Sequence, residues 1–309
     1  MARTFMQLIE ANRVSGLFLS SGVCGSPDAT MAKMLGTVEI LRRRYNFRGF
    51  IHLKVIPGAS EQAIEQAVRL ATRVSVNIEA PSAEHLAKLS GRKRFHEDII
   101  SAMRTIQRLR AACNRRCGQT TQFVVGAAGE TDRQIITATD RLYRGFGVER
   151  VYYSAYQDVE RMGSSPRGLL FDDAPGGRSR PEHASFVREH RLYQVDFLLR
   201  KYGFSRDEIV FGPGGSLSPQ LDPKRVWAER HPEFFPVDVS RAERWQLLRV
   251  PGIGPVGADR IVQARRAGRI DSIESLSRLG VKTSVAERFV TLGRGWWSEK
   301  AVAAADTSR

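Results

Sequence analysis

Cysteines and long apolar runs are what this sequence most lacks. Its 309 residues include three cysteines, Cys24, Cys113 and Cys117, which are too few and too scattered for a disulfide framework. No apolar run approaches the ~20 residues that a membrane-spanning helix needs. The first residues also lack the charged-then-apolar layout of a secretory signal. These absences predict a protein of the reducing cytoplasm.

Acidic residues are scarce relative to basic ones. Asp and Glu total 33 against 48 Lys and Arg, so the formal net charge is +15 at pH 7. Such a charge favours polyanionic partners, namely DNA, RNA or an acidic membrane surface. The motifs HExxH, paired CxxC and GxxxxGK(S/T) are absent, which leaves zinc hydrolysis and nucleotide triphosphate binding without support.

The first half of the chain alternates short apolar runs with amphipathic helical patterns. After a helix over residues 3–12, strands are expected over residues 16–23, 49–56, 73–79, 121–127 and 148–153. Helices are expected between them over residues 31–45, 60–71, 96–112 and 131–146. The pattern predicts an α/β fold over residues 1–156, with a parallel sheet or partial barrel joined by helical crossovers.

The composition changes in the second half. Residues 157–182 are rich in Gly, Pro, Ser and Arg and predict a flexible linker. Residues 183–239 predict a helical connector that opens with a helix over residues 184–202. Residues 296–309 are typical of a frayed tail. The remaining segment, residues 240–295, carries the strongest motif.

That motif is a helical hairpin with a glycine-rich turn. Residues 240–243 (SRAE) have the Ser-x-x-Glu spacing of a capping box, which would open the first helix. The turn is VPGIGP over residues 250–255, and a second helix is expected over residues 256–267. Two glycines permit a tight turn without side-chain bulk, and backbone N–H groups at the start of the second helix can then face a phosphate. An ordinary helical hairpin with a glycine turn is the alternative.

The hairpin resembles the helix-hairpin-helix family, and a weaker echo follows over residues 276–290. Contacts of this kind position a protein on the nucleic-acid backbone but read no base sequence, so salt-sensitive, sequence-independent DNA binding is expected. The residues expected to contact DNA are Gly252, Ile253, Gly254, Val256, Gly257, Arg260, Arg265, Gly280 and Lys282.

Nearly the whole chain resembles the radical-SAM family of DNA modification and repair proteins. The segments that carry the resemblance are GLFLSSGVCGSPDATM (16–31), GFIHLKVIPGAS (49–60), RVSVNIEAPS (73–82), TTQFVVGAAGETDRQI (120–135), RVYYSAYQ (150–157), REHRLYQVDFLLRKYGF (188–204) and LDPKRVWAERHPEFFPVDVSRAERWQLLRVPGIG (221–254). The resemblance implies a partial β/α barrel that binds S-adenosylmethionine on a 4Fe-4S cluster, followed by an α-helical helix-hairpin-helix domain. It also implies a uracil-DNA-glycosylase-like partner.

The resemblance places the cofactor at the carboxyl ends of the barrel strands. Glu79 is then an acceptor for ribose or amino groups, or else a surface carboxylate. Glu130 supports adenine, or else caps a helix, and Tyr153 flanks adenine or belongs to the core. His52 and Lys54 are either inward-facing site residues or a polar pair at the barrel mouth. The cofactor-binding candidates are Ser20, Ser21, Gly22, Glu79, Gly126, Glu130 and Tyr153.

The cysteines depart from the family pattern. Radical-SAM chemistry needs three cysteines spaced CxxxCxxC after the first barrel strand. Here Cys113 and Cys117 have part of that spacing, but Thr120 holds the third place and the run precedes the fourth expected strand. Either the sheet is open by design, or the first strand and its cysteine segment are missing before Met1; we expect the chain as given to hold no metal.

Three functional hypotheses remain open. The first is a radical-SAM-like enzyme that modifies or repairs DNA. The second is a catalytically degenerate protein that binds DNA or a partner without an iron-sulfur cluster. The third is a helix-hairpin-helix glycosylase with Asp271 as its catalytic carboxylate, which the surrounding α/β pattern disfavours.

Overall fold

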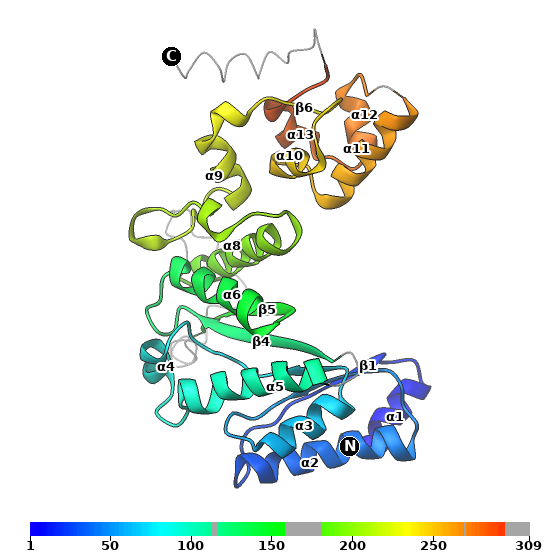
Figure 1. Ribbon diagram of the computed structural model, residues 1–309, viewed down its shortest axis with the longest axis vertical. Coiled ribbons are helices and arrows are strands. Elements are labelled where there is room, and N and C mark those ends of the chain that lie inside the picture. The colour runs from blue at the N-terminus through cyan, green and yellow to red at the C-terminus, as the bar shows by residue number, and fades with distance from the viewer. Residues whose placement is uncertain (113–116, 158–180, 269, 294–309) are drawn as a thin grey trace, which may run out of the picture. The chain divides into compact units, whose positions relative to one another are not determined.

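The computed structural model describes residues 1–112, 117–157, 181–268 and 270–293, with no side chains described for 181–184 (Figure 1). The chain forms two compact units, Met1–Glu189 and His190–Arg309, and the division falls within helix α8 (Pro181–Lys201). Most of the expected linker and the whole expected tail lie outside the described residues. Among the described helices, none is both long and apolar enough to cross a membrane.

Unit 1 is built on a five-stranded parallel sheet that curls into a half-barrel. Every strand pairs with the next one along the chain, so each crossover passes through a helical segment, as the α/β prediction requires. The strands, in both chain and sheet order, are β1 (Gly16–Leu19), β2 (Phe50–Lys54), β3 (Arg73–Ser75), β4 (Gly118–Val125) and β5 (Arg150–Ala155).

The helices of unit 1 begin where the sequence supplies side-chain caps. Ser26, Ser60, Ser82 and Thr131 each accept a hydrogen bond from the backbone N–H three residues further on. Neighbouring helices pack in chain order, α2 against α3, α3 against α5, and α5 against α6 (Figure 1). The helical elements are α1 (Ala2–Glu10), α2 (Pro27–Glu39), η1 (Ile40–Arg44), α3 (Glu61–Leu70), α4 (Ala83–Leu89), η2 (Phe95–Ile100), α5 (Ser101–Ala112) and α6 (Asp132–Phe146).

The two faces of the sheet differ in chemistry. Gln119 of β4 donates to the Met103 carbonyl of α5, and Tyr153 of β5 pairs with Thr139 of α6, so these residues mark the helix-covered face. Strand alternation puts the apolar core of β1 to β5 on that face. The in-register residues of the opposite face, here called the second face, include Phe18, His52, Arg73, Thr120 and Arg150.

The described residues of unit 2 are helical apart from one short strand pair and the connecting loops. Strand β6 (Val237–Asp238) pairs in parallel with β7 (Val290–Thr291), and this pairing joins the two ends of the hairpin segment. The other elements are the end of α8, η3 (Arg206–Glu208), η4 (Pro213–Gly215), α9 (Pro223–Arg230), η5 (Pro232–Phe234), α10 (Arg244–Arg249), α11 (Pro255–Ala267), α12 (Ile273–Arg278), α13 (Thr283–Ala286) and η6 (Glu287–Phe289).

The first hairpin helix begins later than the sequence predicts. Helix α10 starts at Arg244, and its capping box is formed by Glu243 and Gln246 rather than by Ser240 and Glu243. Ser240 instead donates its N–H and its hydroxyl to the Asp238 carboxylate. The prediction of a cap at Ser240 is therefore wrong. The Asp238 carboxylate, two residues earlier, accepts both hydrogen bonds from Ser240 and holds it in a turn before the helix.

The segment expected as a connector packs directly against the hairpins. The Arg249 guanidinium of α10 lies 3.8 Å from the Phe204 ring centroid and donates to the carbonyls of Tyr202 and Gly203. It also pairs with Glu208 at 2.8 Å. Because Arg249 is buried, these contacts fix the end of α8 and η3 onto α10 within unit 2.

Candidate functional site

Unit 2 contains two helical hairpins, and each has a glycine followed by an aliphatic residue in its turn. The first joins α10 to α11 through the turn at Gly252, and the second joins α12 to α13 through the turn at Gly280. Both glycines have left-handed backbone, with φ of +87° and +86°. Ile253 and Val281 follow them, and both side chains are buried. The weaker echo seen in the sequence thus corresponds to a second turn of the same backbone form.

The two turns are bonded to each other. The Lys282 N–H donates to the Gly252 carbonyl at 3.0 Å. A Cβ atom at Gly252 would lie 2.6 Å from the Lys282 carbonyl oxygen, closer than real Cβ contacts come. Gly252 is therefore required both by its positive φ and by the approach of the second hairpin.

The first turn of α11 has backbone N–H donors that no side chain caps. Gly254 is the N-cap and supplies no side-chain cap, while Pro255 at the first helical position has no N–H. The N–H groups of Gly254, Val256 and Gly257 stand in the first turn, where no intrahelical acceptor exists. Val256 is 62% exposed, Gly254 is half-buried, and Gly257 is buried under the second hairpin. These donors and the helix dipole together favour an anion.

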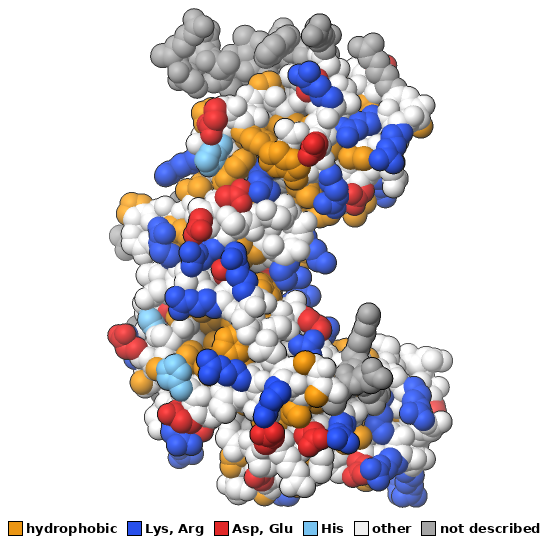
Figure 2. Space-filling view, in the orientation of Figure 1, with side chains coloured by type: hydrophobic (Ala, Val, Ile, Leu, Met, Phe, Trp, Pro, Cys, Tyr) orange, Lys and Arg blue, Asp and Glu red, His pale blue; other side chains and the backbone are white. Residues whose placement is uncertain are grey.

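The cationic side chains expected at this surface have different surroundings. Arg265 donates to the Ala242 carbonyl at 2.5 Å, so part of its guanidinium holds the hairpin together. Arg260 is exposed and lies over the second turn, 3.5 Å from the Leu279 carbonyl. Lys282 is exposed at the start of α13. Figure 2 shows Lys and Arg side chains gathered over α11 and α12.

One cation beside the hairpins escaped the sequence analysis. Lys224 of α9 is 6% exposed, and its ammonium donates to the Ile253 carbonyl at 2.6 Å. Its sequence signal, Asp222 and Pro223 at the start of a helix, predicts the helix but not the tertiary contact. A lysine in such a pattern is ordinarily a solvated side chain.

In unit 1, the predicted cofactor residues other than Tyr153 follow the carboxyl ends of strands of the sheet. Because all strands are parallel, the segments that follow β1, β3 and β4 meet at the carboxyl edge. Ser20, Ser21 and Gly22 follow β1 and are exposed. Glu79 follows β3 with φ of +63°, an unusual conformation outside glycine, and pairs with Lys93 at 3.0 Å. Backbone bonds to β4 hold Glu79 in this position.

The Glu130 carboxylate forms hydrogen bonds within the loop that contains it. Its buried carboxylate accepts the N–H groups of Gly126 at 2.5 Å and Ala128 at 3.0 Å. Arg188 lies 3.5 Å from the same carboxylate and also pairs with Asp132 at 2.6 Å. Glu130 and Gly126 are thus brought together, but in a hydrogen-bonded loop that already uses both carboxylate oxygens.

Tyr153 lies on the helix-covered face, away from the other candidates. Its hydroxyl is 3.0 Å from the Thr139 hydroxyl of α6, and its ring stacks on Phe123 with centroids 6.1 Å apart. Both aromatic residues are buried. This placement matches the alternative in which an aromatic strand residue belongs to the core.

The second face carries polar groups that the sequence analysis largely missed. The His52 Nε2, Thr120 Oγ1 and Arg150 Nε atoms are buried without a hydrogen-bond partner among the described residues. Burial and the nearby Arg73 guanidinium lower the pKa of His52 to about 4, so its imidazole is neutral at pH 7. Alternation alone does not identify these residues, because Arg73 and Arg150 open their strands and resemble boundary residues.

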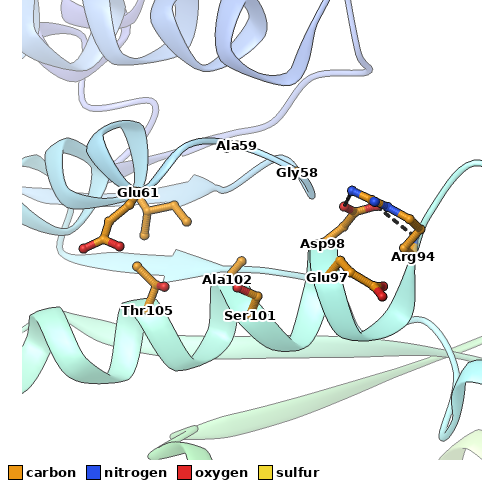
Figure 3. Close-up of a pocket in the computed structure, with 10 residues that line it drawn as sticks. Gly58, Ala59, Glu61, Arg94, Glu97, Asp98, Ser101, Ala102 and Thr105 are labelled. Carbon is orange, nitrogen blue, oxygen red and sulfur yellow. Dashed lines mark hydrogen bonds and ion pairs between the residues drawn. The ribbon is translucent and has the colours of Figure 1, made fainter.

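A hollow of about 230 Å³ lies between α3, α5 and the loop after β2 (Figure 3). Its charged lining is mostly paired, with Arg94 2.9 Å from Asp98. Glu61, also in the lining, lies 2.8 Å from Arg108. None of the residues predicted from the sequence lines this hollow.

The described cysteines do not fit a three-cysteine cluster site. Cys24 follows the carboxyl end of β1, whereas Cys117 immediately precedes the amino end of β4. Because the strands are parallel, these two positions lie at opposite ends of the strands: Cys24 at the carboxyl ends and Cys117 at the amino ends. Cys24 is exposed and Cys117 is buried, and Cys113 lies outside the described residues. The two described cysteines therefore cannot ligate one iron-sulfur cluster together.

Comparison with known proteins adds no assignment. No family model matches the sequence, and no curated protein matches it either.

Proposed function

We propose that this protein binds the sugar-phosphate backbone of duplex DNA without sequence preference, through the paired hairpins of unit 2. In this proposal the two hairpins form a helix-hairpin-helix module. The chain's excess of 15 positive charges strengthens the same interaction over a longer range. The cytoplasmic location expected from the sequence belongs to the same proposal.

One observation carries the proposal: two glycine turns of equal backbone form are bonded to each other and leave uncapped N–H groups at the start of α11. Such donors bind phosphate through backbone geometry, which is the same for every base sequence. Arg260 and Lys282 stand exposed beside them and add charge without fixing a base.

The half-barrel of unit 1 supports a second candidate, a radical-SAM-like role in DNA modification or repair. The observation in its favour is that residues 20–22, Glu79 and Gly126 all follow the carboxyl ends of strands in one parallel sheet. The same edge would hold S-adenosylmethionine. The placement of Cys24 and Cys117 favours the degenerate form of this candidate, which binds DNA or a glycosylase-like partner without a cluster.

The exposed first turn of α11 permits a direct test. Val256→Glu places a carboxylate where the proposal seats a phosphate, while a helix N-terminus tolerates or favours that charge. We expect the dissociation constant for a labelled duplex, measured by fluorescence anisotropy, to rise at least about tenfold, by electrostatic repulsion at close range. Raising the salt concentration should weaken wild-type binding steeply.

Two controls separate local repulsion from general charge. Val256→Gln keeps the size without the charge and is expected to bind within about twofold of wild type, since backbone donors are unchanged. Ala267→Glu makes the same change in net charge at the exposed far end of α11 and is expected to bind within about threefold. Wild-type affinity in Val256→Glu, or equal losses in Val256→Glu and Ala267→Glu, contradicts the proposed site.

A further inference from the structure

Lys224 is a lysine buried behind the first hairpin turn. Its ammonium donates to the Ile253 carbonyl at 2.6 Å and lies 4.6 Å from the centroid of the Tyr202 ring. A lysine is rarely so buried unless its ammonium is paired or hydrogen-bonded, because taking an ammonium out of water is costly. The hydrogen bond directs the charge onto one peptide of the turn, and the Tyr202 ring lies beside the ammonium.

That peptide joins Ile253 to Gly254, the N-cap of α11. Among the described residues, the cis peptide bond is that between Phe235 and Pro236, so the Ile253–Gly254 bond is trans. In a trans peptide the carbonyl and the N–H point in opposite directions. With the Ile253 carbonyl held by the buried ammonium, the Gly254 N–H is directed to the side of the peptide opposite Lys224.

We propose that Lys224 is a positioning residue for phosphate binding: it fixes the Ile253–Gly254 peptide from inside and increases the polarity of the Gly254 N–H that faces the phosphate. The inference rests on the proposed function and adds a residue to it. Polarisation along a chain of hydrogen bonds is the physical basis, since a charged donor on the carbonyl strengthens the donor on the other end of the same peptide. The positive charge also remains close to the phosphate in a poorly screened interior.

The groups around Lys224 decide its protonation. The pKa of Lys224 is lowered to about 7, mainly by burial; Asp222 at the start of α9 acts in the opposite direction, and Arg249 on α10 adds to the lowering. Tyr202 at the end of α8 faces the ammonium, and the burial of Tyr202 raises the pKa of its hydroxyl. Glu208 of η3 is paired with Arg249.

The direction of the pH effect follows from linkage. A bound phosphate favours the protonated ammonium, so the complex holds the Lys224 proton more tightly than the free protein does. Below a pH of about 7 the charge is present before binding, whereas above it the proton must be taken up on binding. Duplex affinity should therefore fall as the pH rises from 6 to 8.5.

The test is the pH profile of duplex binding by the full chain, measured by anisotropy at constant ionic strength. We expect wild-type affinity to drop about tenfold between pH 6 and 8.5. Lys224→Met should bind about tenfold more weakly at pH 6 and show a flat profile. Lys224→Gln retains a donor for the Ile253 carbonyl without the charge, so it should recover part of the affinity but none of the pH dependence.

Arg230→Met is the matched control, because it removes one exposed charge from the same helix and touches no part of the turn. It should keep the pH profile and bind within about twofold of wild type. If Lys224→Met fails to fold, as judged by circular dichroism, Lys224→Gln and the wild-type profile decide the outcome. A flat wild-type profile, or a wild-type profile in Lys224→Gln, overturns the inference.

The Val256→Glu variant distinguishes the two proposals. If Val256→Glu abolishes binding and the Lys224 variants behave as wild type, the phosphate site stands and the role of Lys224 falls. If Val256→Glu binds as wild type, the site itself is absent.

Discussion

At the scale of single residues, the two glycines of the first turn are under different structural constraints. Gly252 combines a φ of +87° with an approach to the Lys282 carbonyl that leaves no space for a Cβ atom. Gly254 has an extended backbone, with φ of −94°, and a Cβ there would meet the Tyr202 hydroxyl at 3.4 Å. The first glycine is therefore needed to form the turn, whereas the second contributes only its N–H to the proposed phosphate site.

We expect Gly252→Ala to destabilise unit 2 by about 2–4 kcal/mol, from backbone strain and the displaced second hairpin. Gly254→Ala should cost under about 1 kcal/mol, because Ala adopts its backbone without strain and keeps the N–H. Urea unfolding followed by tryptophan fluorescence measures both, since all tryptophans of the sequence lie in residues 190–309. Equal losses in the two variants would mean that the contact between the hairpins is not what constrains Gly252.

At the scale of elements, Arg42 joins η1 to the start of β2 and to the end of α3. This buried guanidinium donates to the carbonyls of Leu70 at 2.9 Å and Phe47 at 2.7 Å. It also donates to the Gly49 carbonyl at 2.9 Å and to the Thr72 hydroxyl at 3.3 Å. These bonds satisfy carbonyl groups that the ends of the elements leave open.

Arg42→Met should lower the free energy of unfolding of unit 1 by about 2–4 kcal/mol, because several carbonyls lose their donor at once. The adjacent Arg43→Met is the control: its side chain is 78% exposed and pairs with Glu39 at the surface, so a change within about 0.5 kcal/mol is expected. Far-ultraviolet circular dichroism during denaturation gives both values. Similar unfolding midpoints for the two variants would show that the Arg42 bonds add little.

At the scale of the whole molecule, charge and cysteine placement act in different ways. The net charge of +15 supports binding of any polyanion and does not depend on the fold. Cysteine placement depends entirely on the fold, since the sheet separates Cys24 from Cys117 by placing them at opposite ends of its strands. A metal cluster needs thiolates from one place, and these two do not provide it.

We therefore expect anaerobic reconstitution with iron and sulfide to give no stoichiometric 4Fe-4S cluster on this chain, while duplex binding is retained. A Cys24→Ala, Cys117→Ala double variant should take up the same small amount of iron as wild type. Iron and acid-labile sulfide determinations, with the visible absorption spectrum, provide the measurement. A full cluster in wild type that is lost in the double variant would restore the radical-SAM enzyme as the leading candidate.

The amino-acid sequence determined much of this protein by itself. The alternation of apolar strands and amphipathic helices in the first half is local information, and it predicted the α/β class and the approximate position of each strand of the sheet. The sequence also predicted the glycine turn and the helix that follows it, because tight turns with positive φ favour glycine. The capping prediction at Ser240 was wrong because this serine donates to Asp238, two residues earlier, and the helix begins after it.

Tertiary structure alone decided which groups meet. Glu130 is turned into its own loop, Tyr153 faces α6, and Lys224 is carried from a distant helix to the Ile253 carbonyl. The Tyr153 and Lys224 contacts join residues far apart in the chain, which a local sequence pattern does not encode. The Glu130 contacts are local, but the sequence pattern does not show which way this side chain turns. Burial of Lys224, and with it the shift of its pKa, arises only when α9 and the hairpin close around the ammonium.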